Sequence, residues 1–161
     1  MLFLRKTATF QSEKYPQISF TLRVLNHIQR ARRDANVAEE LAQYREKIRR
    51  SARLYNEVIA GVDESGRAAA LEANSNADEI ARLNDEANRI YLSVIVPNAL
   101  RACYVSIDGI GLVDGQELTV EALLDSAPED LLEEMVNRCE ATSGLTEDQQ
   151  KNSESPTTSA A

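Results

Sequence analysis

The side chains that could carry out chemistry are few in this sequence, and their spacing does not favour catalysis. His27 is the only histidine, so a Ser/His/Asp or Cys/His arrangement would have to use it, on a segment flanked by arginines. A catalytic histidine also needs a partner that orients it and a pocket that receives the substrate. We therefore interpret His27 as a surface or hinge residue and predict that the protein is not an enzyme.

The cysteines and carboxylates do not form a recognisable metal site. Cys103 and Cys139 show neither a CxxC motif nor Cys/His spacing. Without a secretory signal they are expected to be reduced and buried, with a disulfide or a reactive thiol as the alternatives. An acidic cluster lies in a predicted helix, whereas an EF-hand needs a loop with alternating oxygen ligands around a glycine. The members of this cluster are Asp125, Glu129, Asp130, Glu133 and Glu134. We predict no metal and no cofactor.

A basic set in the first third of the chain is the strongest candidate for a binding surface. Its members are Arg45, Lys47, Arg49, Arg50 and Arg53. Residues 1–53 hold 12 Lys/Arg against 5 Asp/Glu and residues 54–161 hold 6 against 21, so the two parts carry +7 and −15. Phosphate contacts are the alternative, but the net charge of −8 opposes polyanion binding and aromatic residues for stacking are lacking. We expect an acidic protein partner, or the acidic part of another copy, in preference to nucleic acid.

The elements that must position these residues begin with strands. Leu2, Leu4, Ala8 and Phe10 alternate with mostly polar residues, and residues 18–24 repeat the same period of two. This alternation predicts a β-hairpin over the first 25 residues. A further short strand is expected at 103–107, followed by turns at Asp108-Gly109 and Asp114-Gly115. Gly109-Ile110-Gly111 lacks the third glycine of a nucleotide loop, which again favours a turn.

Helices occupy most of the remaining sequence. Residues 26–33 are expected to be a helical lead-in with exposed arginines at 30, 32 and 33, and a long helix is predicted from about 36 to 59. Its apolar stripe consists of Val37, Leu41, Tyr44, Ile48, Ala52, Tyr55 and Ile59. A second long helix is predicted from about 67 to 91, with a possible break at Asn74-Ser75-Asn76, and Pro97 should end or kink it. Two such helices joined by a short link predict an antiparallel helical hairpin.

The C-terminal third predicts a helix pair and then a polar tail. Helix signals return at Thr119, and Ser126-Ala127-Pro128-Glu129 has the pattern of a capping box. The fold class is therefore α+β: a small sheet around the N-terminal hairpin, a long helical hairpin and a C-terminal helix pair. We expect one compact domain over residues 1–144 and a disordered polar tail over 145–161. No apolar run approaches the roughly 20 residues that span a bilayer, so a cytoplasmic protein is expected.

Three segments of the C-terminal third resemble a known family. They are Tyr104-Val105-Ser106-Ile107-Asp108-Gly109-Ile110, Leu112-Val113-Asp114-Gly115-Gln116-Glu117-Leu118-Thr119 and Ala127-Pro128-Glu129-Asp130-Leu131-Leu132-Glu133-Glu134. With the ending Leu145-Thr146-Glu147-Asp148-Gln149-Gln150-Lys151-Asn152 before a Ser/Pro/Thr tail, they are similar to tail assembly chaperones of long-tailed bacteriophages. The resemblance covers residues 100–155, and the rest of the chain only in outline.

The resemblance implies a non-catalytic helper in the cytoplasm of a host cell. Such chaperones coat the long, aggregation-prone tape measure protein and help to recruit tail tube subunits. The resemblance carries over no residue as a defined binding site. Two alternatives come from the residues themselves: a structural subunit of a phage particle, and a nucleic-acid-associated regulator that uses the Arg-rich helix.

The same resemblance predicts two products from one gene. Codons for lysine and asparagine can be rich in A, and such runs let a ribosome slip back by one base. We expect a slip site at or near the codons of Lys151-Asn152 and an overlapping frame that continues past the local stop. The nucleotide sequence tests this: a gene without a slip-prone run, or without an overlapping frame, has a single product.

Overall fold

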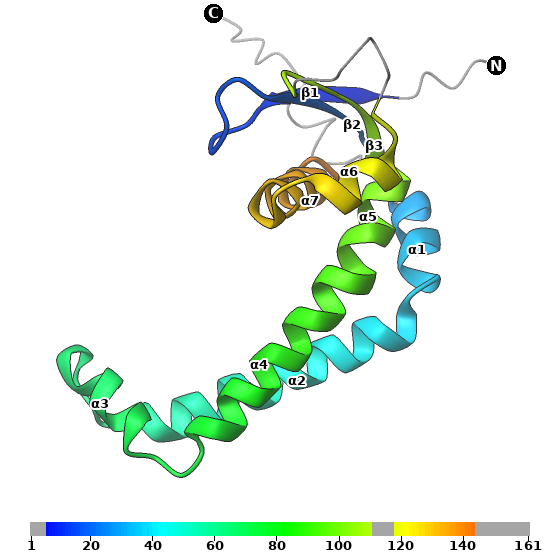
Figure 1. Cartoon of the computed structure of the whole chain (residues 1–161). Coiled ribbons are helices and arrows are strands. Elements are labelled where there is room, and N and C mark those ends of the chain that lie inside the picture. Colours follow the sequence, from blue (N-terminus) through cyan, green and yellow to red (C-terminus); the bar gives the residue numbers. More distant parts are fainter. Residues whose placement is uncertain (1–5, 111–117, 144–161) are drawn as a thin grey trace, which may run out of the picture. The chain divides into compact units, whose positions relative to one another are not determined.

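The computed structural model describes residues 6–110 and 118–143 and has an α+β fold (Figure 1). Contacts divide the chain into two compact units, the first formed by Met1–Ala35 with Asn98–Ala161 and the second by Asn36–Pro97. The single domain expected over residues 1–144 stays a prediction, because two contact units do not decide whether the chain unfolds in one step or two. The tail expected over residues 145–161 lies outside the described residues.

The sheet of the first unit has three antiparallel strands in the order β1-β2-β3. They are β1 (Thr7–Gln11), β2 (Ser19–Arg23) and β3 (Tyr104–Asp108). Phe10 lies opposite Phe20 on β1, and Ile107 lies opposite Phe20 on β3, so the central strand places an aromatic ring at the middle of the core. Phe20 is fully buried. The predicted hairpin is confirmed, although Leu2 and Leu4 lie outside the described residues.

Helices of the first unit cover the apolar face of this sheet, and α7 packs against β2. They are α1 (His27–Ala35), α5 (Val96–Cys103), α6 (Val120–Ser126) and α7 (Glu129–Ser143). The core between them is almost entirely aliphatic, since Leu100, Leu123, Leu131 and Met135 are all fully buried. The C-terminal helix pair is confirmed. The capping box is not: the Ser126 hydroxyl donates to the Ala122 carbonyl in α6 and does not cap α7.

The second unit is a helical hairpin. Its elements are α2 (Ala38–Ile59), the 3₁₀ turn η1 (Glu64–Gly66), α3 (Arg67–Glu72), α4 (Ala77–Ile90) and the π-helical turn η2 (Tyr91–Ile95). The break expected at residues 74–76 separates α3 from α4. Of the two outcomes expected at Pro97, an end or a kink of the helix, the end is not found, because α5 includes this proline. The π-turn directly before Pro97 is the local adjustment, since a proline has no N–H to offer the preceding turn.

The turn that follows β3 requires a glycine at position 109. Its φ is +85°, and a Cβ atom there would lie 1.8 Å from the Gln17 carbonyl oxygen in the β1–β2 loop. Gly61 is a natural comparison, because its φ is +75° but nothing lies within 4 Å of the place that a Cβ atom would take. The two glycines therefore separate backbone strain from steric conflict.

We predict that Gly109→Ala destabilises the protein by more than Gly61→Ala. The left-handed backbone costs about 1–2 kcal/mol for alanine at either position, and the steric conflict adds to this at Gly109 alone. Chemical denaturation of both variants measures the difference. Equal losses would show that the loop of Gln17 moves away freely.

Candidate protein-binding surface

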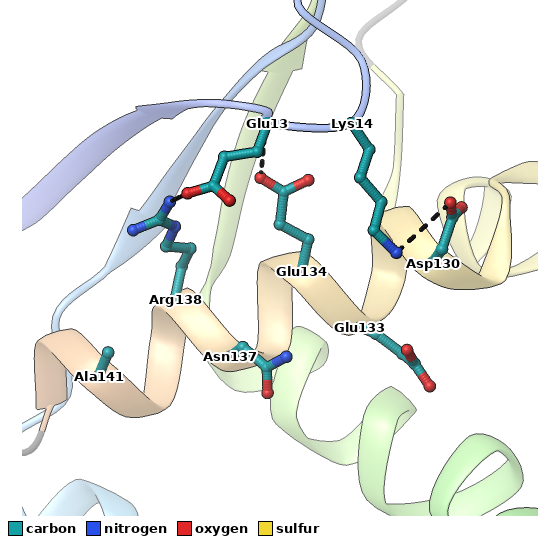
Figure 2. A pocket seen from close by; sticks show the side chains of 8 residues that line it. All are labelled: Glu13, Lys14, Asp130, Glu133, Glu134, Asn137, Arg138 and Ala141. Atoms are coloured by element: carbon teal, nitrogen blue, oxygen red, sulfur yellow. Dashed lines mark hydrogen bonds and ion pairs between the residues drawn. The ribbon is translucent and has the colours of Figure 1, made fainter.

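Three members of the acidic cluster, Asp130, Glu133 and Glu134 of α7, line a hollow of about 380 Å³ beside the β1–β2 loop (Figure 2). Two of its carboxylates hold that loop. Glu134 accepts hydrogen bonds from the Ser12 hydroxyl (2.7 Å) and the Glu13 amide (2.8 Å). Asp130 accepts one from the Tyr15 hydroxyl (2.9 Å) and forms an ion pair with Lys14. Their oxygens are therefore engaged by the protein itself.

The rest of the hollow gives no ligand site. Arg138 pairs with Glu13 and lies 5.8 Å from the centre of the Phe10 ring. Figure 2 shows that Glu133 and Asn137 turn away from the loop. Within residues 6–110 and 118–143, no group of three or more His, Cys, Asp or Glu side chains is placed to hold a metal ion. We interpret the hollow as the contact region between the β1–β2 loop and α7. The contacts of Glu134 and Asp130 with this loop are called the clamp below.

The electrostatics of Glu134 agree with this interpretation. Burial alone would raise the pKa of Glu134, but the amides of Glu13 and Lys14 and the hydroxyl of Ser12 lower it below its ordinary value. The hydrogen bond from Tyr15 likewise lowers the pKa of Asp130. Donors that bind the charged form stabilise it, so the clamp requires ionised carboxylates.

The histidine and the cysteines are placed as expected. His27 is exposed at the start of α1, and Cys103 and Cys139 are buried free thiols. Their mutual hydrogen bond and burial raise the pKa of Cys103, which disfavours the reactive thiolate. The expected exposure of Arg33 is wrong. It is only 8% exposed and is paired with Asp34 and Glu140, so its charge serves the first unit internally.

The face of α2 that packs on α4 coincides only in part with the predicted apolar stripe, since Tyr44 belongs to both. The contact row of α2 has heptad spacing: Tyr44, Lys47, Ser51 and Val58 are placed in it by their contacts or burial. Leu54, which is half-buried, occupies the remaining position of this spacing. The Tyr44 ring stacks on Tyr91 with the ring centres 5.9 Å apart, and the Ser51 hydroxyl bonds to the Asn84 side-chain oxygen at 2.7 Å. Ser51 and Val58 are the two buried residues of α2. On α4 the buried face is the predicted one, with Ile80, Leu83 and Ala87.

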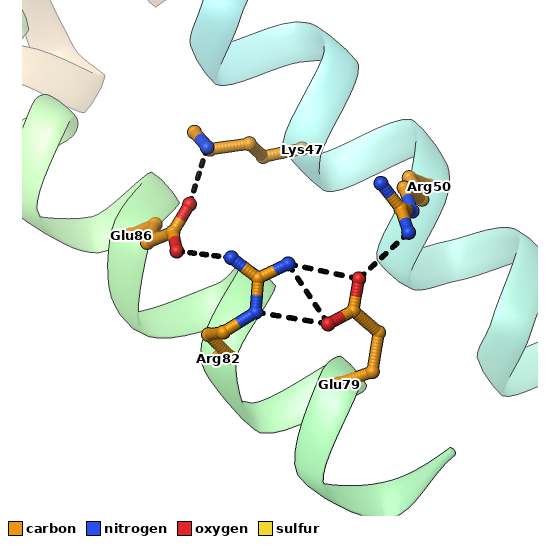
Figure 3. Close-up of polar contacts among 5 residues, drawn as sticks. All are labelled: Lys47, Arg50, Glu79, Arg82 and Glu86. Carbon is orange, nitrogen blue, oxygen red and sulfur yellow. Dashed lines mark hydrogen bonds and ion pairs between the residues drawn. The ribbon is translucent and has the colours of Figure 1, made fainter.

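Ion pairs run along one side of this contact (Figure 3). Lys47 pairs with Glu86, and Arg50 pairs with Glu79 at 2.8 Å. Arg82, also on α4, pairs with both of these glutamates. The hydrogen bond from Lys47 lowers the pKa of Glu86, which stabilises the charged form of this carboxylate. Two members of the predicted basic set, Lys47 and Arg50, are therefore paired with glutamates of α4 within the hairpin.

The other three members lie elsewhere on α2. Arg45, Arg49 and Arg53 are spaced four residues apart, which places them in one row along the helix, and all three are exposed. Arg49 pairs with Glu46 in the same helix at 3.2 Å. Arg45 and Arg53 have no ion-pair partner in the described part of the chain. The predicted protein-binding surface stays a prediction; three of its five residues form this row, and the other two are paired with α4.

Beside this Arg row lies the apolar stripe that the sequence predicts. Consecutive helix residues are about 100° apart, so contact through Lys47 and Ser51 turns their neighbours Ile48 and Ala52 outward. Ile48 is 41% exposed, Ala52 is exposed, and Tyr55 and Ile59 are half-buried. We call these four residues the apolar row, and the apolar and Arg rows together the outer face of α2.

The outer face has a shape as well as a chemical character. A shallow hollow opens between its side chains, lined by Arg49, Ala52, Arg53, Asn56, Glu57 and Ala60. Ile48 is one of three large hydrophobic residues exposed in the described structure, and the others, Ile28 and Val105, are in the first unit. The periodicity of α2 revealed the apolar row, but it did not reveal that Ile48 and Ala52 stay exposed in the folded hairpin.

Comparisons with known proteins identify no relative of this chain. No protein-family model matches it, and neither a curated protein nor a solved structure is significantly similar to it. Among the described helices, none has both the length and the apolar character needed to cross a membrane.

We predict that Glu134→Gln destabilises the protein in a pH-dependent way. The folded pKa of Glu134 lies below its ordinary 4.5, so its ionised form contributes stability above that pH. The contribution is lost as the pH falls through the folded pKa. The melting temperature of the variant should be lowest relative to wild type near about pH 7, and the difference should shrink in acid.

Glu133→Gln is the matched control, since it removes the same charge from the same helix turn without touching the loop. If both variants show the same pH profile, the clamp at Glu134 contributes nothing specific.

Proposed function

We propose that this protein is a non-catalytic assembly chaperone that binds another protein through the outer face of α2. The observation that carries the proposal is the apolar row beside three exposed arginines: a helix normally buries such a row, but here Ile48 and Ala52 are exposed and Tyr55 and Ile59 are only half-buried. Apolar side chains grouped on a surface and bordered by polar ones are typical of interaction sites. Side chains spaced four and three residues apart suit contact with another helix.

The resemblance in the C-terminal third makes this proposal more specific. We propose assembly of a phage tail in the cytoplasm of a host cell, with the tape measure protein as the coated chain and the tail tube subunit as the recruited one. A long helical protein with apolar stripes needs those stripes covered before it assembles. Many copies, each covering one stretch, would hold such a chain by avidity.

A nucleic-acid-associated regulator is less well supported. Lys47 and Arg50 are neutralised by Glu86 and Glu79, and Arg49 shares its charge with Glu46. Phosphate binding needs cations along a path, and on α2 the Arg row supplies only three of them, one of which is shared with Glu46. An apolar row would add nothing to such contacts. No feature of the described residues favours a structural subunit of a particle over a chaperone.

Co-expression tests the proposal. On this proposal the partner is a long helical protein, for which genes adjacent to that of this chain are the first candidates, and its soluble yield is measured with and without the chaperone. We expect wild type to keep it soluble and Ile48→Asp to abolish most of the effect. Loss of a buried isoleucine costs about 1.5–3 kcal/mol, and burial of the new carboxylate adds to this cost. Affinity should fall by at least about tenfold.

Ile28→Asp is the matched control, because Ile28 is also exposed (51%) but lies on α1 in the first unit. It should leave the soluble yield unchanged. Equal yields for wild type and Ile48→Asp would show that the outer face of α2 does not bind this partner.

A further inference from the structure

The apolar row has the geometry of a binding site for one helix. From Ile48 to Ile59 the intervals are four, three and four residues, so the side chains lie along a straight line of about 16 Å. This is the spacing at which the side chains of a second helix fit into the gaps of the first. The hollow beside Arg49 and Arg53 extends this binding site toward the Arg row.

The Arg row determines which helix fits. Arg45 and Arg53 have no ion-pair partner among the described residues, and Arg45, Arg49 and Arg53 all lie on one side of the apolar row. A helix seated on this row would place its own flank within reach of these arginines. An acidic flank gains attraction there, whereas a basic flank meets like charge at each turn.

A second copy of this chain does not satisfy these conditions. In an antiparallel pair of α2 helices related by a two-fold axis, each flank meets the same flank of its mate. The Arg row would then face another Arg row. In a parallel pair it would face the opposite flank of α2, and there α4 is already packed through Lys47, Ser51 and Val58. Charge and packing both favour a different protein.

We propose that the outer face of α2 binds a partner helix that carries a row of acidic side chains beside an apolar stripe of heptad spacing. This inference rests on the proposed function, because it names the class of partner for the same face. It adds a charge requirement to the partner, and this requirement can be tested without knowing its identity.

Two synthetic peptides test the charge requirement directly. Each is a helix of about three heptads with leucine at the stripe positions, and only the flanking row differs, with glutamate in one and lysine in the other. Binding to the full chain is followed by fluorescence anisotropy, below the concentration at which either peptide self-associates. We expect the glutamate peptide to bind roughly tenfold more tightly than the lysine peptide. The preference should weaken in high salt.

Charge reversal identifies the residues responsible. The double variant Arg45→Glu/Arg53→Glu breaks no ion pair among the described residues, and circular dichroism checks its helix content. It should lose the preference for the glutamate peptide or reverse it. The control Arg67→Glu/Arg89→Glu makes the same change in net charge on α3 and α4 and should keep the preference.

Each contrary result has a distinct meaning. If both peptides bind equally, or neither binds, the charge requirement is wrong. Sedimentation showing a dimer of the free chain that Ile48→Asp disrupts would make a second copy the occupant and overturn the proposal. If the co-expression effect of Ile48 persists without peptide selectivity, the proposed function stands and this inference falls. If peptide selectivity is found without any co-expression effect, this inference stands and the proposed function falls.

Discussion

The polar contacts between α2 and α4 fix the rotation of α2 about its own axis, and the exposed surface of the hairpin follows from this rotation. Ser51 bonds to Asn84, and Lys47 and Arg50 pair with glutamates of α4. The ion-paired groups are partly exposed, so each ion pair contributes only about 0–1 kcal/mol. The hydrogen bond of the buried Ser51 hydroxyl contributes about 0.5–1.5 kcal/mol. The effect of these contacts is to select one of two competing arrangements. A turn of about 100° would bury Ile48 and Ala52 against α4 and break all three contacts.

The two arrangements are close in hydrophobic content, which is why small polar terms can decide between them. The contact row contains Tyr44, Leu54 and Val58, whereas the apolar row contains Ile48, Tyr55 and Ile59. Either row could cover the buried face of α4, which consists of Ile80, Leu83 and Ala87. When apolar areas are similar, direct hydrogen bonds of a buried serine and ion pairs with the correct spacing settle the register and the rotation.

This competition explains what could be predicted from the sequence. Strand alternation and helix spacing are local signals. The hairpin of strands, the helical hairpin and the C-terminal helix pair could therefore be predicted from the sequence. The rotation of α2 could not, because it depends on Glu79, Asn84 and Glu86, which are remote in the sequence. The same limit applies to Arg33, whose burial depends on Glu140. A basic side chain can be recognised from the sequence alone, but its partner becomes visible only once the chain is folded.

An exposed apolar row favours association between copies of the chain, and the Arg row beside it opposes this association. Exposed aliphatic side chains on a helix promote association between copies, and flanking charges are a common means of preventing it. Here an antiparallel two-fold contact through the outer face would bring the arginines of α2 against their own copies, so like-charge repulsion opposes this form of self-association. An acidic partner meets no such penalty. On the proposed function, the Arg row would therefore act twice: it would keep the free chaperone from associating through its apolar row, and it would favour the partner whose charge complements it.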